Sequence, residues 1–429
     1  MKLEHFKCPP KEYRTSPFWS WNDMLSDNEL CWQVQEMKKQ GFGGFFMHAR
    51  EGLRTPYLSQ TWFDSISAAV NEAEKQNMEA WLYDEDRWPS GCAGGIVTAK
   101  EDEYKAKYLL MQFISELEIE QYSTDPSTVA VFCLKFDGDI LVKFERISLF
   151  DQLKPGEKEA VGEKVLYCAF LIKIQKPTNN SNGHGYIDVL NPKAVKEFIR
   201  VTHTQYHDKT GKYFGTVIPG IFADEPTYRS KAEDSMPWSP EFPRYFREHH
   251  NYDVVDNLPL LFFDCDKSAK VRYHYFYTLT KKFVECFTLE LYNWCSKHGI
   301  QFTGHYLSED TMVKQTNAIG SAMAHYQYMH IPGIDHLGNN IHDALTLKQC
   351  ASIGSQFKRK RLLCEIFGVS GHQMTFEDQK WIANFHFALG ITFLSQHLVL
   401  YSMRGERKRD YPPTFSYHQP YWSYYNKIN

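Results

Sequence analysis

The feature that most constrains the fold of this chain is a regular alternation of short apolar runs with long amphipathic stretches. The runs have the length of buried strands, and the stretches between them carry apolar residues at helical spacing. This alternation is typical of βα units, in which parallel strands form a sheet that helices cover. We therefore expect an α/β protein built on a parallel sheet.

The pattern predicts eight strands and the helices that connect them. The strands are expected at 17–22, 42–48, 78–83, 217–223, 300–305, 333–337, 361–366 and 391–400. The helices are expected at about 26–41, 60–76, 192–207, 269–297 and 376–389. Eight such units predict a (β/α)8 TIM barrel. An open sheet of six strands is the alternative, because 333–337 is a weak strand pattern.

The pattern changes between residues 104 and 190. The segments VAVFCLKF, ILVKFERI and KVLYCAFLIKI alternate as antiparallel strands do, and Asp137, Gly138 and Asp139 supply a turn between the first two. A small antiparallel β domain is thus expected as an insertion after strand 3. The first part of the barrel then occupies 1–103, the inserted domain 104–190, and the remaining barrel with a C-terminal extension 191–429.

Composition excludes several classes of protein. With 48 basic and 52 acidic residues and a net charge of -4, the chain has no basic field for a nucleic-acid backbone. The ten cysteines contain no Cys-x-x-Cys pair, which argues against a zinc ribbon or a thioredoxin-type site. The N-terminal residues lack a signal-peptide core, and no run is long enough to span a membrane. A soluble, cytoplasmic protein is expected; its oligomeric state is left open.

Reactive and aromatic side chains follow almost every predicted strand. In a TIM barrel the active site lies at the carboxyl ends of the strands, where the βα loops converge. We therefore expect a deep polar cleft with aromatic walls. The residues expected to contact substrate there are Trp19, Trp21, Asn22, His48, Arg50, Asp84, Asp86, Arg87, Trp88, Asp224, His305, Tyr306, Asp335, His336 and His397.

Two glutamates are the candidate catalytic pair. Glu225 follows the apolar strand in GIFADEP, and Glu365 lies in LLCEIFG. Apolar surroundings raise a carboxyl pKa, as a general acid requires near neutral pH. Strands 4 and 7 lie across a barrel from each other, so the two side chains would face one another over its mouth. Cleavage of a glycosidic bond needs such a pair, one acid and one nucleophile or base. An ion pair with a nearby Arg or Lys is the alternative for either residue.

Asp84 and Asp86 admit two interpretations. Alternation along a strand places both on one side, where they could bind sugar hydroxyls or help to hold a calcium ion. They could equally be loop charges paired with Arg87. The nearby segment SGCAGG (90–95) lacks the spacing of a phosphate-binding loop, and we interpret it as a tight turn that lets backbone approach the cleft.

Several segments together resemble a known family. PFWSWN, GFGGFFMHAR with GLRTPYLS, AWLYDEDRWPSGCAGG, FADEP and GIDHLG are similar to bacterial barrel glycosidases related to the α-L-rhamnosidases of glycoside hydrolase family 106. The resemblance covers most of the barrel. It implies a hydrolase acting on plant or microbial glycans, with an oligosaccharide or glycoside as its partner, inversion of the anomeric centre, and calcium as a candidate cofactor; no cofactor is firmly required.

The chain departs from that family in two ways. Family members are longer and carry β-sandwich domains after the barrel, so we expect a piece or a reduced version of such a protein. Glutamates on strands 4 and 7 are also the arrangement of retaining barrel enzymes, which conflicts with inversion. A carboxyl separation of roughly 5–5.5 Å means retention and roughly 6.5–9.5 Å means inversion.

A glycosidase is therefore the predicted function, with two alternatives. A glycan-binding barrel that has lost the reaction is the first. A metal-dependent barrel hydrolase is the second, and it is disfavoured because His48, His305 and His336 are isolated rather than paired ligands. The inserted domain either binds sugar or braces the barrel and shapes the substrate site, and we favour the second role.

Overall fold

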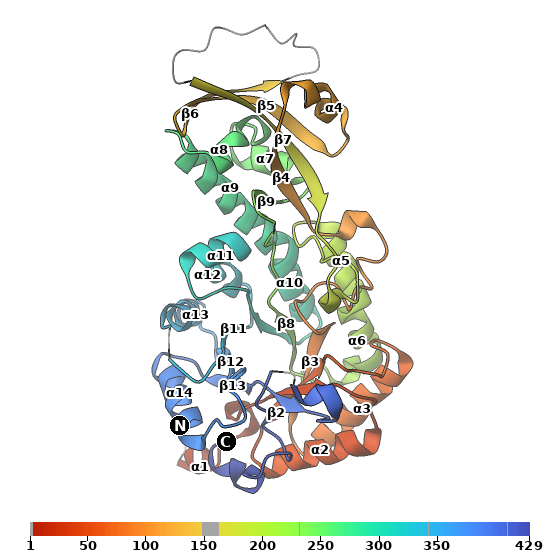
Figure 1. Ribbon diagram of the computed structural model, residues 1–429. Coiled ribbons are helices and arrows are strands. Elements are labelled where there is room, and N and C mark those ends of the chain that lie inside the picture. The colour runs from red at the N-terminus through yellow and green to blue at the C-terminus, as the bar shows by residue number, and fades with distance from the viewer. Residues whose placement is uncertain (1–2, 148–162, 231, 342, 410) are drawn as a thin grey trace.

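The parallel strands of the computed structural model form a barrel (Figure 1). The structure describes residues 3–147, 163–230, 232–341, 343–409 and 411–429. Its parallel sheet has the order β13-β12-β11-β10-β8-β3-β2-β1-β14. The strands are β1 (Phe18–Trp21), β2 (Gly44–Ala49), β3 (Glu79–Asp86), β8 (Gly220–Asp224), β10 (Gln301–His305), β11 (Ile331–His336), β12 (Leu363–Ile366), β13 (Phe393–Gln396) and β14 (Val399–Leu400).

The two ends of this sheet meet through the eighth predicted strand, which is split in two. β13 pairs with β12, and β14 pairs with β1, where Val399 lies opposite Trp19. Residues 397–398 alone separate β13 from β14. The run predicted at 391–400 therefore joins the two ends of the sheet. The expected (β/α)8 barrel is confirmed, and the six-stranded alternative is wrong.

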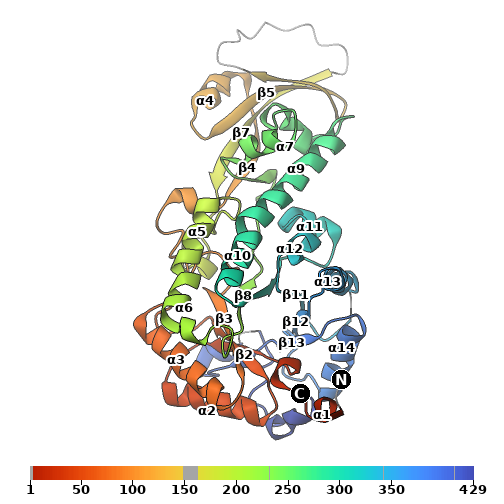
Figure 2. The same cartoon turned by 180° about the vertical axis from the view of Figure 1, so that it is seen from behind.

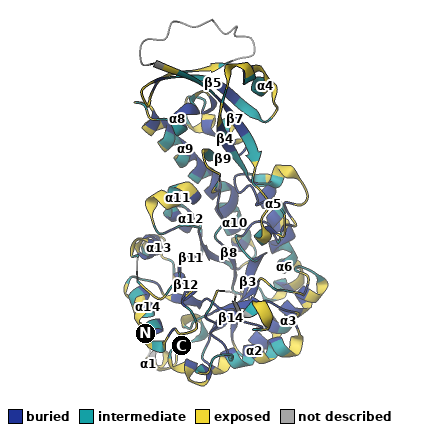
Figure 3. Cartoon of the chain, in the orientation of Figure 1, coloured by how far each residue is buried: buried dark blue, intermediate teal, exposed yellow. Residues whose placement is uncertain are grey.

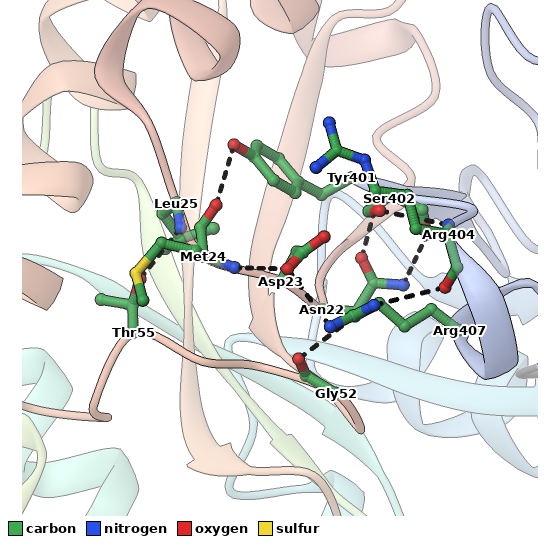
Figure 4. A network of polar contacts seen from close by, with 10 residues as sticks. All are labelled: Asn22, Asp23, Met24, Leu25, Gly52, Thr55, Tyr401, Ser402, Arg404 and Arg407. Carbon is green, nitrogen blue, oxygen red and sulfur yellow. Dashed lines mark hydrogen bonds and ion pairs between the residues drawn. The ribbon is translucent and has the colours of Figure 1, made fainter.

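A network of polar contacts holds this junction together (Figure 4). The side chain of Asn22, just after β1, donates to the Ser402 carbonyl and accepts from the Ser402 N–H, both at 2.9 Å. Arg407 pairs with Asp23 at 3.3 Å. Asn22 is fully buried and joins the first and last strands. Its predicted contact with substrate is thus corrected to a structural role.

Aromatic side chains fill the inside of the barrel. The ring centroids of Phe18 and Phe222 lie 4.9 Å apart, and those of Phe46 and Trp81 lie 5.3 Å apart. Inward-pointing side chains from neighbouring strands stack in layers in barrels of this type. Figure 3 shows the strands as a buried centre surrounded by helices whose outer faces are exposed. The barrel is therefore packed below its mouth, which confines any reaction to the strand ends.

Helices cover the outside of the barrel (Figure 2). They are α2 (Asp27–Lys39), α3 (Gln60–Lys75), α5 (Pro192–Val201), α6 (His203–Thr210), α9 (Ser268–Phe283), α10 (Leu289–Lys297), α11 (Met312–Ala318), α12 (Ala322–Tyr326), α13 (Leu345–Gln356) and α14 (Phe376–Ala388). The long helix expected at 269–297 consists of α9 and α10, joined by a π turn at Val284–Thr288. Helix α3 begins where the Ser59 hydroxyl accepts the Trp62 N–H, as an N-cap residue does.

A second, antiparallel sheet stands at the far end of the molecule from the chain termini (Figure 1). Its order is β6-β5-β7-β4-β9. The strands are β4 (Lys107–Ile114), β5 (Thr128–Asp137), β6 (Ile140–Ile147), β7 (Glu163–Ile174) and β9 (Ser235–Trp238). The predicted turn at 137–139 connects β5 to β6, with Gly138 at a φ of 59°. Four of the five strands lie between β3 and β8 in the chain, as an insertion after strand 3 requires.

The region between β8 and residue 268 packs against this second sheet. It contributes β9 as well as α7 (Phe242–His249) and α8 (Pro259–Phe262). Phe262 lies 5.5 Å from Phe170 of β7, and Phe263 lies 5.2 Å from Phe136 of β5, measured between ring centroids. The apolar face of the antiparallel sheet is therefore covered by residues outside 104–190.

Both chain termini lie at the amino ends of the barrel strands. Thr15, three residues before β1, donates its hydroxyl to the side-chain oxygen of Asn429 at 2.9 Å, and Asn429 also contacts the Gln40 carbonyl that follows α2. Figure 1 marks both termini beside α1 (Leu3–Lys7). Among the helices in the described ranges, none has both the length and the apolar composition needed to cross a membrane.

Replacing Arg361 with alanine should destabilise the protein. Arg361 pairs with Glu79 at 3.0 Å and lies over the Trp81 and Phe393 rings, 5.1 and 4.7 Å from their centroids. The variant leaves a buried carboxylate without its partner, so we expect a loss of about 3 kcal/mol in the free energy of unfolding, measured by urea denaturation.

The matched control is Arg244→Ala, because Arg244 forms an exposed ion pair with Glu241 at 3.0 Å. This variant should lose less than about 1 kcal/mol. Equal losses for the two variants would show that the Arg361 pair does not stabilise the barrel.

Candidate active site

Carboxylates from several strand ends converge on His305 at the mouth of the barrel. His305 ends β10, and its Nε2 lies 3.1 Å from Oδ1 of Asp224, which ends β8. Its Nδ1 lies 3.7 Å from Oε2 of Glu365 in β12. Glu225 and Asp335 each place a carboxylate oxygen within 4.8 Å of a His305 nitrogen. These five residues are referred to below as the His305 cluster.

Burial and neighbouring charges shift the pKa of several groups in this cluster toward the protonated form. Burial, followed by the charge of Asp224, raises the pKa of Glu225 to about 8. Burial raises the pKa of Asp335 to about 7, and burial with the charge of Asp335 raises the pKa of Glu365 well above its ordinary value. Burial alone would lower the pKa of His305, but its hydrogen bond to Asp224 and the surrounding carboxylates raise it well above its ordinary value. A carboxyl that stays protonated near neutral pH can act as a general acid.

Neutral polar rings line the other side of the cluster. Tyr83 is hydrogen-bonded to Asp224 through its hydroxyl, and its ring stacks on His48 with centroids 3.7 Å apart. His397 Nε2 lies 3.6 Å from Oε1 of Glu365. Burial lowers the pKa of both His48 and His397 well below the ordinary value. Both histidines are thus uncharged at neutral pH and available for hydrogen bonds at the cluster.

An arginine lies between two aromatic rings at the edge of the cluster. The guanidinium carbon of Arg50 is 5.1 Å from the ring centroid of Trp88 and 5.1 Å from that of Tyr411. Trp88 hydrogen-bonds Glu225, and the Tyr411 ring lies 6.0 Å from His397. The structure therefore brings Arg50 and Trp88 beside Glu225. Tyr411 was missed, because it follows the last strand in a segment without periodic pattern.

A further buried carboxyl, Glu309, was also missed. Its Oε1 accepts the Tyr306 N–H at 2.9 Å and the Tyr326 hydroxyl at 2.6 Å. Burial raises its pKa to about 7, and its charge in turn raises the pKa of Asp335. The sequence feature that could have predicted Glu309 is its position in the loop directly after His305. Glu309 lies behind the cluster and acts on it through charge.

Two predicted substrate contacts on β1 lie elsewhere. Trp19 donates its indole N–H to Gln33 of α2 at 2.8 Å, and the Trp21 ring lies 5.0 Å from that of Trp62 in α3. Both tryptophans are fully buried. They point outward, into the layer between the strands and the helices. The positions of β1 that point into the barrel belong to Phe18 and Ser20, and all four residues are buried.

Tyr306 and His336 were also predicted to contact substrate, and their side chains also point toward the helices. The Tyr306 hydroxyl is 2.6 Å from that of Thr288, in the π turn between α9 and α10. The His336 ring lies edge-on to His386 of α14, with centroids 4.6 Å apart. Both side chains therefore contact the helix layer, on the opposite face of their strands from the His305 cluster.

The predicted pair Asp84 and Asp86 contacts the loops beside β3. Asp84 accepts the Ser90 hydroxyl at 2.6 Å, and Asp86 accepts the side-chain amide of Asn182 at 3.0 Å. Within the described ranges, the acidic and histidine groups close enough to share a metal ion belong to the His305 cluster. Asp84 and Asp86 instead fix the loops beside β3.

The segment SGCAGG wraps around Glu85. The Glu85 carboxylate accepts backbone N–H groups from residues 91–94, with Gly91 and Ala93 both at 2.9 Å. Gly91, Ala93 and Gly94 adopt positive φ values of 134, 51 and 62°, which allow consecutive N–H groups to converge. The loop is therefore held by an internal carboxylate, and the predicted approach of its backbone to the cleft is replaced by this structural role.

Arg87 lies beside a polar hollow at the rim. Its side chain pairs with Glu51 at 3.0 Å, and its carbonyl accepts the Tyr83 hydroxyl at 2.8 Å. The hollow has a volume of about 500 Å³ and is lined by Glu51, Arg87, Asn179, Asn180, Asn182 and Gly183. Arg87 thus connects this hollow to the His305 cluster.

Comparison with known proteins supports the fold. The sequence matches no protein-family model and no curated protein. A rhamnosidase from Novosphingobium sp. PP1Y has a similar structure, with a TM-score of 0.70 and 13% identity over 99% of this chain. A β-galactosidase from the psychrophilic Marinomonas ef1 follows with a TM-score of 0.51 and 8% identity over 96% of this chain. The chain spans 59% of the rhamnosidase and 58% of the galactosidase.

The stability of the protein should fall as the pH rises from about 7 through about 8, when measured in EDTA, because the buried His48 and His397 are already uncharged in this range. Folded Glu225 keeps its proton up to about pH 8, whereas its ordinary pKa is 4.5. The folded state therefore binds more protons between these values, and the stabilisation present below the lower value is lost as the pH rises through the higher one. Urea denaturation at several pH values measures this slope.

The Glu225→Gln variant should show a smaller decrease across the same pH range, because it removes one of the titrating groups. Glu120→Gln, an exposed change on α4 (Ile119–Thr124), should keep the original slope. A slope unchanged in Glu225→Gln would contradict the raised pKa.

Proposed function

We propose that this protein is a glycoside hydrolase that uses Glu225 and Glu365 as its two catalytic carboxyls. The observation that carries this proposal is their convergence: both lie at the carboxyl ends of barrel strands and flank the same histidine, His305. A pair of carboxyl groups at one mouth is the arrangement that glycosidic cleavage needs.

Glu225 fits the general acid. Its pKa of about 8, set by burial and the charge of Asp224, keeps a proton on the carboxyl at neutral pH. The Trp88 indole hydrogen-bonds this carboxyl and holds its orientation. Glu225 would donate its proton to the leaving oxygen as the bond to the sugar breaks.

Glu365 fits the second carboxylate. Its two oxygens lie 3.7 Å from His305 Nδ1 and 3.6 Å from His397 Nε2. Burial and the charge of Asp335 raise the pKa of Glu365 well above its ordinary value, and the His305 charge opposes them. In this role Glu365 would act in the ionised form that His305 favours. Ionised Glu365 would stabilise positive charge on the sugar ring, as nucleophile or as base for water. The carboxyl separation in a substrate complex decides between retention and inversion.

We propose an α-L-rhamnoside as substrate, in the manner of glycoside hydrolase family 106. Two points support this: the resemblance of the WLYDEDRWPSG segment to that group, and the likeness of the fold to that of the Novosphingobium rhamnosidase. The side chains around the His305 cluster that would bind the sugar are His48, Arg50, Trp88, Asp224, Asp335 and His397.

Calcium remains a candidate cofactor, with a different ligand set from the one first expected. Asp224, Asp335 and Glu365 offer carboxylate oxygens, the donors calcium prefers, and Asp335 Oδ1 is buried without a hydrogen-bond partner. A bound cation would supply the positive charge that the raised pKa values of Asp335 and Glu365 indicate is lacking. His305 is a nitrogen donor, which suits calcium poorly, and would stay a neighbour rather than a ligand.

A cytoplasmic location is proposed from the cysteines. All ten are free thiols, several of them buried, such as Cys168 and Cys364. Proteins exported to oxidising compartments commonly carry disulfides, whereas reducing compartments keep thiols free. Secretion of the native protein into the medium would contradict this proposal.

Glu225→Gln and Glu365→Gln should each lower kcat/KM on 4-nitrophenyl α-L-rhamnoside by at least about 100-fold. An activated dinitrophenyl glycoside needs little protonation of its leaving group. On that substrate, Glu225→Gln should recover most of its activity and Glu365→Gln should not.

Glu120→Gln serves as the matched control and should be fully active. Full activity of both site variants would refute the catalytic assignment. Binding of rhamnose by calorimetry, with no turnover of any aryl glycoside by the wild-type protein, would favour the glycan-binding alternative instead.

Calcium should stabilise the protein more strongly at high pH. Millimolar CaCl2 should raise Tm more at about pH 8 than at about pH 5, because protons compete for the same carboxylates at low pH. MgCl2 should act more weakly, and Asp335→Asn should lose much of the calcium effect. A Tm that calcium leaves unchanged at both pH values would remove calcium from the proposal.

A further inference from the structure

The hollow beside Arg87 has walls from three separate parts of the chain. Glu51 follows β2, Arg87 follows β3, and residues 179–183 belong to the return from the antiparallel sheet to the barrel. Its volume of about 500 Å³ falls within the range of small-molecule sites. A ligand here would therefore contact both the barrel and the inserted segment.

The wall formed by residues 179–183 is firmly attached. Asn182 donates its side-chain amide to Asp86 at 3.0 Å and to the Gly94 carbonyl at 2.9 Å. A Cβ placed on Gly95 would come within 2.5 Å of the Ser181 carbonyl oxygen, so the two backbones are in close contact. Figure 1 shows β7 running from the antiparallel sheet toward the barrel, and this segment follows it. The inserted unit thus contributes a fixed wall at the barrel mouth.

Hydrogen bonds through Tyr83 and Trp88 link the wall of the hollow to the His305 cluster. The Arg87 carbonyl accepts the Tyr83 hydroxyl at 2.8 Å, and the same hydroxyl contacts Asp224. The next residue, Trp88, hydrogen-bonds Glu225. The carboxyl assigned above as the acid is therefore one residue removed from the hollow.

The walls of the hollow are polar. Within the described part of the chain, the side-chain amides of Asn179 and Asn180 make no hydrogen bond to protein, and each offers both a donor and an acceptor. Arg87 donates to the Asn179 carbonyl at 2.5 Å, which places this backbone against the guanidinium. Such walls match the hydroxyl groups of a sugar better than a flat apolar ring.

We propose that this hollow is the leaving-group subsite and that it binds a sugar or another polyhydroxyl group through the segment 179–183. This rests on the proposed glycosidase function and deepens it: the natural substrate is a disaccharide or longer glycan rather than an aryl glycoside. The inserted unit then contributes directly to substrate binding.

The test compares two substrates that share the same terminal sugar. kcat/KM is measured for a 4-nitrophenyl glycoside and for disaccharides ending in that sugar, beginning with α-L-rhamnosides. The double variant Asn179→Ala/Asn180→Ala should lower the ratio of disaccharide to aryl-glycoside activity about tenfold, because two hydrogen bonds to the leaving group are lost. Asn426→Ala, an exposed asparagine at the opposite end of the barrel, should leave the ratio unchanged.

The outcomes separate the two proposals. If the wild-type protein cleaves the aryl glycoside and the double variant keeps the original ratio, the subsite is refuted while the glycosidase function stands. If no glycoside is cleaved, the glycosidase function fails and the subsite fails with it. Only a ratio that falls in the double variant, and not in Asn426→Ala, supports the inference.

Discussion

The site depends on the electrostatic balance around one buried histidine. Asp224 and Glu365 lie within 3.7 Å of the His305 nitrogens, and Glu225 and Asp335 are close by. So many carboxyls cannot all ionise in a buried space with one cation among them. The cluster must share protons or bind a further cation, and this requirement accounts for the raised pKa of Glu225.

The barrel could be predicted from the sequence because its strands are short apolar runs that alternate regularly with amphipathic helices. The sequence did not predict which side chains of each strand point into the barrel and which point toward the helices. Phe18, Trp19, Ser20 and Trp21 are all buried, so the pattern of polar and apolar residues does not show which of them point into the barrel. The aromatic content favoured Trp19 and Trp21 as substrate contacts, whereas Phe18 and Ser20 hold the positions that point into the barrel. Tyr306 and His336 were misplaced for the same reason.

The end of β3 shows a different limit. The pairing of β2 with β3 shifts in register between Met47 and Ala49, so simple alternation no longer predicts where Asp84, Glu85 and Asp86 point. The Glu85 carboxylate accepts hydrogen bonds from the backbone of the loop that follows it in the chain. Residue type alone does not reveal this contact. By contrast, Glu225 and Glu365 were found because each follows a strongly apolar strand, and their desolvation could be anticipated from that. Their catalytic roles stay predictions.

The position of the termini has a practical consequence. Thr15 and Asn429 meet at the amino ends of the strands, and the His305 cluster lies at the carboxyl ends. A tag or surface linker attached at either terminus would leave the mouth turned toward bulk solution. The mouth of the immobilised protein should consequently remain accessible to large molecules in solution.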